Sequence, residues 1–108
     1  MAGLNNPSLQ DLTQAVANGT LTLLDRPDWM TEADTADLHA ANGGCMNAAM
    51  RLARTVDAEW TWNVGYDNRA VFTSRSDAES VITVISLSPA HALLIATLQA
   101  KARRVPSA

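Results

Sequence analysis

Few residues of this sequence are of types that could do chemistry, and they are widely spaced. His39, Cys45 and His91 are the only histidines and the only cysteine. A cysteine thiolate activated by an imidazole is a nucleophile, and both groups are also zinc ligands. A zinc site needs further ligands at a spacing such as CxxC or HExxH, and the sequence contains neither motif. We therefore predict no metal site, a surface His39, and a Cys45 that is buried beside Met46.

Two other patterns could belong to an active site. Gly43-Gly44 could open a phosphate-binding loop, but neither GxGxxG nor GxxxxGK[ST] occurs, so the pair is interpreted as the end of a helix. Asp57 and Glu59 could act as paired carboxylates, which only a cleft would make reactive. They flank a predicted strand start, where we expect them to be solvated. The sequence therefore predicts no catalytic residue, no cofactor and no enzymatic activity.

The segment EWTWNVGYD, residues 59–67, holds two of the three tryptophans and the only tyrosine. Trp60 and Trp62 alternate with polar residues, so they lie on one face of a predicted strand. If a helix covers that face, both belong to the core, which is the interpretation we favour. If the face is open, they form with Tyr66 a platform for stacking or for a partner. A ligand pocket would then combine Trp60, Trp62 and Arg69 for stacking and for binding phosphate.

Acidic residues are concentrated in one part of the chain. Residues 1–50 carry six acids and one base, whereas residues 51–108 carry five acids and seven bases. The net charge of −3 gives no overall basic field, so direct nucleic-acid binding is not predicted. The acids between residues 25 and 37 form either a solvated helix face or a negative patch for a basic partner surface. Trp29 lies among them, either as a lid over the core or as an exposed anchor. The residues predicted for partner binding are Asp25, Asp28, Trp29, Glu32, Asp34, Asp37 and Tyr66.

Helices must position these residues in the first half of the chain. The Asn-Pro step at residues 6–7 predicts a helix start, and Gly19 predicts the end of that helix. Thr31 followed by Asp34 predicts the start of a second helix, which ends at Asn42-Gly43-Gly44. Helical spacing of apolar residues predicts a third helix. Those residues are Met46, Ala49, Met50, Ala53 and Val56.

After the third helix, the sequence takes the two-residue period of strands. The predicted strands are residues 60–64, 70–74 and 81–86. A turn at residues 67–68, with Gly65 or Asn68 at positive φ, joins the first two. Ser88 and Pro89 predict the start of a final helix that is apolar around most of its axis and so buried on more than one side. Its apolar residues are Leu93, Leu94, Ile95, Ala96 and Leu98. We expect their surplus apolar surface to pack on a second copy, giving a homodimer.

The predicted fold class is α+β, with N-terminal helices, a three-stranded antiparallel meander, and a C-terminal helix packed on the sheet. At 108 residues the chain is expected to be a single domain, with a helical part at 1–44, the helix, meander and closing helix at 45–104, and a tail at 105–108.

The composition also narrows the class of protein. A single cysteine excludes an internal disulfide and fits a reducing compartment. The first residues lack the pattern of a signal peptide. Residues 80–100 carry no charge, but Pro89 and His91 interrupt them. We therefore interpret this segment as a buried strand followed by a buried helix, rather than as a membrane span.

Two segments carry a resemblance to a known group of proteins. AMRLARTVDAEWTWNVGYDNRAVFTS and LSPAHALLIATLQAKARR are similar to parts of small uncharacterised proteins of phages and prophages. Those proteins have a tryptophan-rich strand, a return strand and a closing helix opened by a Ser/Thr-Pro-Ala step. In many of them that helix reads Ala-Leu-Cys or Ala-Ile-Cys, whereas this chain has Leu94-Ile95-Ala96. The resemblance implies a phage-related α/β sandwich, and residues 1–44 have no counterpart in it.

The resemblance, together with the lack of catalytic motifs, implies a non-enzymatic phage-derived interaction protein. We predict an inhibitor of a bacterial defence system, of the anti-CRISPR type, that sterically blocks a basic nucleic-acid-binding site. Its partner would be a host defence protein or ribonucleoprotein complex in the cytoplasm of the bacterial host cell, with no membrane contact. The alternative is a small-ligand or nucleotide-binding domain with a tryptophan-lined pocket. A virion or regulatory accessory protein is a third interpretation.

Overall fold

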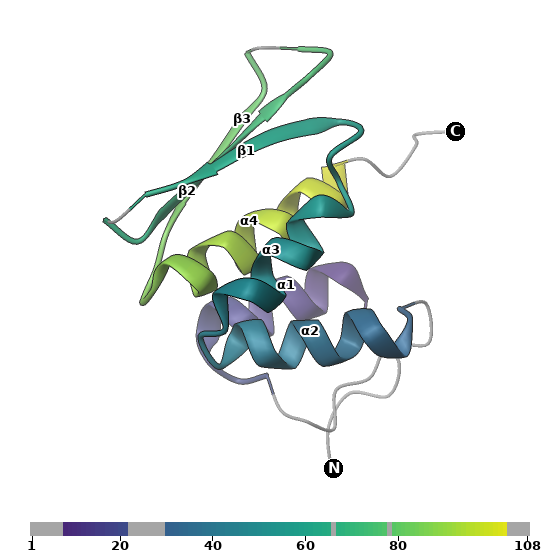
Figure 1. The fold of residues 1–108 in the computed structure, drawn as a ribbon, viewed down its shortest axis with the longest axis vertical. Helices are drawn as coiled ribbons and strands as arrows, with labels where there is room; N and C mark the ends of the chain where they lie inside the picture. The colour runs from purple at the N-terminus through teal and green to yellow at the C-terminus, as the bar shows by residue number, and fades with distance from the viewer. Residues whose placement is uncertain (1–7, 22–29, 66, 78, 104–108) are drawn as a thin grey trace.

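The computed structural model describes residues 8–21, 30–65, 67–77 and 79–103. Along the described chain, three helices precede a three-stranded antiparallel sheet and one helix follows it. The last helix packs on that sheet (Figure 1). The predicted α+β fold class is therefore confirmed. The elements are α1 (Leu9–Asn18), α2 (Glu32–Asn42), α3 (Met46–Arg54), β1 (Trp60–Val64), β2 (Arg69–Ser74), β3 (Val81–Ile85) and α4 (Pro89–Arg103).

Helix α4 is the centre of the molecule. Nine consecutive residues, 90–98, are buried. The sheet lies on one side of α4, and α1, α2 and α3 contact it from the other sides (Figure 1). Thr97 carries the only buried hydroxyl in this stretch. The hydroxyl donates to the carbonyl of Leu93 at 2.7 Å, so this buried polar group has a hydrogen-bond partner. Over residues 90–98, the helix that the sequence predicted to be apolar around most of its axis is covered on all sides.

Burial of α4 removes the reason for the predicted dimer contact. The five apolar residues expected to present surplus surface are each no more than 5% exposed within one chain. They are Leu93, Leu94, Ile95, Ala96 and Leu98. The helices of the first half account for the difference, because they cover α4 on the side that the sheet leaves open. Helix α4 therefore has no surplus apolar face for a second copy.

Helix α1 begins with a reciprocal cap. The amide of Asp11 donates to the hydroxyl of Ser8 at 3.1 Å, and the amide of Ser8 donates to the carboxylate of Asp11 at 3.1 Å. The predicted cap at residues 6–7 is therefore wrong by two positions, and those residues lie outside the described chain. The predicted end is confirmed, because Gly19 takes the left-handed conformation at φ 72°.

Helices α2 and α3 are separate, as predicted. The hydroxyl of Thr31 accepts from the amide of Asp34 at 3.0 Å and caps α2. The helix ends at Gly43, and Gly44 follows at φ 102°, a value that a residue with a Cβ rarely adopts. Cys45 then stands at the start of α3 with its side chain exposed. The predicted burial of Cys45 is wrong, because the buried face of α3 is made by later residues. These are Ala48, Ala49, Leu52 and Ala53.

The sheet is a meander in the order β1-β2-β3. Phe72 of the central strand pairs with Trp62 of β1 and with Ile82 of β3, so these side chains share the face that packs on α4. The turn between β1 and β2 places Asn68 at φ 60°, one of the two positions predicted. The opposite face has no described element over it (Figure 1). It carries Thr61, Asn63, Arg69, Val71, Thr73, Val81, Thr83 and Ile85, and we call it the open face.

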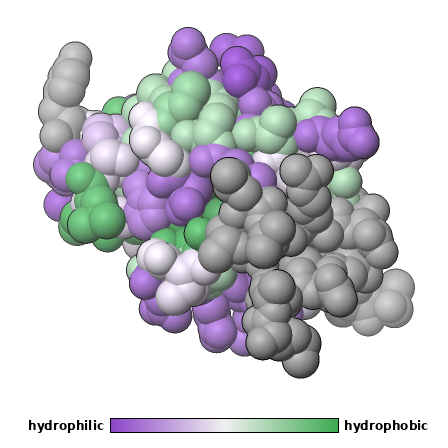
Figure 2. Space-filling view, turned by 90° about the horizontal axis from the view of Figure 1, so that it is seen from below, coloured by the Kyte–Doolittle hydropathy of each residue, from purple (hydrophilic) through white to green (hydrophobic). Residues whose placement is uncertain are grey.

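The uncharged segment 80–100 folds as β3 and most of α4. None of the helices in the described ranges is long and apolar enough to cross a membrane. Seen from the helical side, hydrophilic and hydrophobic residues are mixed over the part that is not grey (Figure 2). The large exposed hydrophobic residues of the described chain lie instead in and directly after β3.

Core truncation in α4 tests this architecture. Leu94→Ala and Leu98→Ala should each lower the free energy of unfolding by about 2–5 kcal/mol, because each leaves a cavity beside several elements. Leu87→Ala is the matched control. Leu87 is 87% exposed, so its loss should cost less than about 0.5 kcal/mol. Urea unfolding of the three variants measures this, and equal losses for Leu94 and Leu87 would contradict the central position of α4.

Candidate functional site

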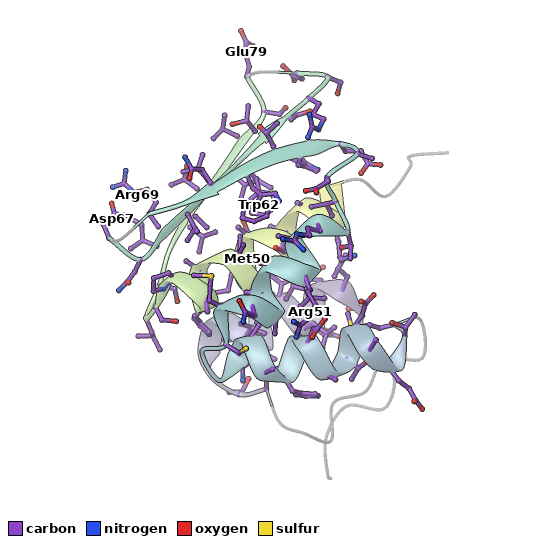
Figure 3. The ribbon with its side chains drawn as sticks, viewed as in Figure 1. Met50, Arg51, Trp62, Asp67, Arg69 and Glu79 are labelled. Carbon is purple, nitrogen blue, oxygen red and sulfur yellow. The ribbon has the colours of Figure 1, made fainter. Side chains whose placement is uncertain are left out.

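The two tryptophans of β1 have different surroundings. Trp60 is 5% exposed and belongs to the core, as favoured by the sequence. Trp62 is half-buried, lies below β1 on the side of the helices (Figure 3) and stacks on Phe72 with ring centroids 6.4 Å apart. Its indole N–H donates to the carboxylate of Asp57 at 2.9 Å. Trp62 therefore closes the edge of the core, and its polar atom is engaged within the chain.

The predicted pocket of two tryptophans and one arginine does not form. Side chains alternate between the two faces of a strand, and the register places Trp60 on the covered face and Arg69 on the open face. Trp60 is buried, so it offers no surface to a ligand. Trp62 and Arg69 do border one hollow, which lies on the open face beside β1.

The hollow on the open face has a volume of about 670 Å³. The lining residues come from β1, β2 and the turn between them. They present hydroxyl, amide, apolar and charged groups to the hollow. The lining residues are Thr61, Trp62, Asn63, Gly65, Asp67, Arg69, Val71 and Thr73. Sequence reasoning missed this site because it looked for a function on the face of the tryptophans. The signal was present in the threonines and Asn63, which alternate with those tryptophans.

The cationic groups at the ends of the open face are already engaged. The Nε of Arg69 lies 3.4 Å from the carboxylate of Asp67, and the Nε of Arg75 donates to the carbonyl of Asp57 at 2.6 Å. The lack of a side chain at Gly65 leaves space for the carboxylate of Asp67 in the turn. A Cβ on Gly65 would lie 2.9 Å from the Oδ1 of Asp67. A phosphate at Arg69 would therefore meet a carboxylate, which opposes its binding.

Acidic side chains flank the open face at both hairpins. Asp67 lies in the turn between β1 and β2, while Asp77 and Glu79 lie between β2 and β3, and all three residues are exposed. Figure 3 shows Asp67 and Glu79 at opposite ends of the sheet. The open face is thus a mainly neutral surface, with Asp77 and Glu79 near one end and Asp67 paired with Arg69 at the other. Such a surface complements a partner with basic side chains at its rim.

Strand β3 is not the buried strand that the sequence predicted. Ile82 and Val84 are buried, whereas Val81 is 43% exposed and Ile85 is 63% exposed. Leu87, directly after the strand, is more exposed still. Every residue from Val81 to Ile85 is apolar or threonine, so hydrophobicity alone did not distinguish the two faces. The exposed side chains extend the open face as an apolar strip along its edge.

The predicted acidic patch is only partly described. Asp25, Asp28, Trp29 and Tyr66 lie outside the described residues. Glu32 is exposed and Asp34 is half-buried, both in the first turn of α2.

Asp37 serves the packing of two helices. Both the Nη2 and the Nε of Arg51 donate to its carboxylate, at 2.8 and 3.1 Å. The hydrogen bond and the charge of Asp37 raise the pKa of Arg51 above its usual value. This bidentate pair joins α2 to α3 and leaves Asp37 largely buried and charge-paired, so a partner would meet Glu32 and Asp34 rather than Asp37.

Among the remaining chemically capable residues, His91 has a structural role. Within the described ranges, no three His, Cys, Asp or Glu side chains are grouped so as to hold a metal ion. His91 is buried, and its Nδ1 is 2.5 Å from the hydroxyl of Ser86. Its amide donates to the hydroxyl of Ser88 at 3.1 Å, which confirms Ser88 as the predicted cap of α4. These contacts hold the corner between β3 and α4.

Comparison of the chain with protein-family models, with curated proteins and with solved structures gave no match. The resemblance to small phage proteins thus remains a prediction from the sequence.

Fluorescence quenching distinguishes the two tryptophans. A Trp29→Phe/Trp62→Phe variant retains only Trp60, and a Trp29→Phe/Trp60→Phe variant retains only Trp62. Acrylamide should quench Trp60 much less than Trp62, because Trp60 lies in the core and Trp62 at its edge. Equal quenching of the two would show that the face of β1 toward α4 is accessible, and would restore the tryptophan platform as a binding surface.

Proposed function

We propose that this chain is a non-enzymatic interaction protein that binds a partner protein through the open face of its sheet. The observation that carries the proposal is the composition of that face. An antiparallel sheet often leaves one face to water, and such a face is usually polar. Here Val71, Val81 and Ile85 stand among the threonines, and no described element covers them. Exposed apolar residues grouped on one uncovered face are a common feature of interaction sites.

The charges of this surface favour a protein partner over a nucleic acid. Binding to phosphates requires available lysine or arginine side chains. Arg69 is next to Asp67, and Arg75 is bonded to the main chain of residue 57. The exposed acids Asp77 and Glu79 at the hairpin between β2 and β3 would instead attract a basic surface and orient it on approach. The preferred partner is therefore a protein whose binding surface has basic side chains around an apolar or hydroxyl-rich centre.

The phage-like resemblance supports a particular class of partner. A bacterial defence complex that binds nucleic acid has basic side chains that contact the phosphates. The chain would act in the cytoplasm of the bacterial host, as an inhibitor of the anti-CRISPR type, by occupying that site on a defence protein or ribonucleoprotein. The net charge of −3 is consistent with this role. Glu32 and Asp34 at the start of α2 provide a second acidic surface that could extend the contact.

Plasmid interference measures this activity directly. The chain is expressed in a panel of cells, each with an active CRISPR–Cas system of a different type. In at least one of them, transformation by a targeted plasmid should rise to the level of a non-targeted plasmid. Thr61→Arg/Asn63→Arg should abolish the effect, because both residues line the hollow and point outward from β1. Gln10→Arg/Gln14→Arg is the control, because it adds the same charge to exposed positions of α1, away from the proposed contacts.

Two results would contradict the proposal in different ways. Undiminished interference with every system in the panel would exclude a CRISPR inhibitor. Full inhibition by the folded Thr61→Arg/Asn63→Arg variant would exclude the open face as the binding surface, and would direct attention to Glu32 and Asp34.

A small ligand is the second candidate, because the hollow of about 670 Å³ is within the size range of ligand sites. A nucleotide could bind there only if its phosphate displaced Asp67 from Arg69. Such binding would raise the melting temperature, since a ligand at 100 times its Kd stabilises the folded state by about 2.7 kcal/mol. Arg69→Ala should remove that shift, and Arg54→Ala, at an exposed position of α3, should retain it. If no nucleotide changes the melting temperature, this candidate fails.

A further inference from the structure

The main-chain groups of β3 point alternately toward β2 and toward an edge that has no described strand beside it. The amide of Ser74 donates to the carbonyl of Ser80 at 3.0 Å. At the other end of the ladder, the amide of Ser86 donates to the carbonyl of Asn68 at 3.1 Å. With the antiparallel register of β2 and β3, these bonds assign the even-numbered residues of β3 to β2. The amides and carbonyls of the odd-numbered residues therefore point outward. These residues are Val81, Thr83 and Ile85.

This edge lacks the features that protect edge strands of monomeric proteins. Such strands usually carry a charged side chain, a proline or a bulge. The sequence of β3, VITVI, contains no charge and no proline, and its pairing with β2 has no bulge. The exposed large hydrophobic residues of the described chain also gather here, in Val81, Ile85 and Leu87. The outward main-chain groups of β3 can therefore form hydrogen bonds with another strand, and its exposed side chains can pack against that strand.

The other edge of the sheet is partly closed. The amide of Trp60 points away from β2 and donates to the carbonyl of Val56 at 3.0 Å. The segment before β1 also holds the indole of Trp62 through Asp57. The chain therefore folds against the start of β1 and the side chain next to it. Strand β3 is the more accessible edge for pairing.

We propose that β3 pairs antiparallel with β3 of a second copy of this chain, around a twofold axis at Thr83. In this register Val81 faces Ile85 of the second copy, and Thr83 faces its own equivalent. Each of these pairs exchanges two main-chain hydrogen bonds, because their amides and carbonyls point outward. Between them, Ile82 faces Val84 of the second copy on the side of α4. Every pair is apolar with apolar or threonine with threonine, which are favourable cross-strand pairs.

The positions of the charges support a second copy in this orientation. The acids nearest to β3 are Asp77 and Glu79, which precede the strand at one end. Antiparallel pairing places the acids of the two copies at opposite ends of the joined strands, so they do not face each other. Leu87, which follows the strand, then lies beside Glu79 of the second copy. The contact uses the same patch twice, as a twofold interface requires.

The resulting dimer has one six-stranded sheet whose two open faces lie on the same side. The α4 helices of both copies lie on the other side of that sheet. This inference does not depend on the proposed function, since the variants that test the hollow change β1 only.

Proline at residue 83 tests the pairing. Thr83→Pro removes an amide that points away from β2, so the ladder between β2 and β3 stays complete and an edge position tolerates the ring. Thr83→Ala is the matched control, because it removes the same side chain and keeps the amide. In analytical ultracentrifugation over a concentration series, the wild type and Thr83→Ala should form dimers. Thr83→Pro should remain a monomer with an unchanged circular dichroism spectrum.

Hydrogen exchange on the wild type gives an independent test, which decides the matter even if Thr83→Pro does not fold. The amides of Val81, Thr83 and Ile85 should become protected as the protein concentration rises, whereas those of Ile82 and Val84 should be protected at all concentrations. A strict monomer at high micromolar concentration would overturn the proposal. A dimer in which the Thr83 amide exchanges freely, or in which Thr83→Pro is folded and still dimeric, would overturn it as well.

Discussion

The fold depends on covering one helix on all sides. Nine consecutive residues of α4 are buried, and burying a large apolar side chain stabilises the folded state by about 1.5–3 kcal/mol. A helix with no solvent face needs a layer on each side, so neither the sheet nor the N-terminal helices suffice alone. The sheet covers one side of α4, and α1, α2 and α3 cover the rest. Residues at both ends of the chain thereby form one core.

This arrangement determines which surfaces remain for other molecules. Because α4 occupies one face of a sheet with only three strands, the other face and the β3 edge have no described cover. The two surfaces differ in chemistry. The open face offers the hydroxyl and apolar groups of its side chains, with Asp77 and Glu79 near one end, while the β3 edge offers main-chain amides and carbonyls. A partner protein on the face and a second copy at the edge could therefore be bound at the same time.

The residue types that first suggest chemistry mostly stabilise the fold. Trp60 fills the core, Trp62 stacks at its margin, and His91 bonds the corner between β3 and α4. Asp37, which resembled part of an acidic binding patch, joins α2 to α3 through Arg51. The surfaces proposed for binding are instead lined by threonine, asparagine and aliphatic residues, whose types alone attract no attention in a sequence.

The sequence by itself determined the elements, because caps and turns are made by residues only a few positions apart. Thr31 with Asp34, Ser88 before Pro89 and the turn at Asn68 all act within such short segments. The α+β class followed from the order of those elements. The tertiary structure decided which faces are covered. In β3 the four apolar residues suit a buried position equally, and only the location of α4 makes Ile82 and Val84 inward and Val81 and Ile85 outward. The pair of Asp37 and Arg51, fourteen residues apart, likewise exists only because α2 and α3 pack together. Local sequence specifies a helix or a strand, but burial depends on what the rest of the chain places over it.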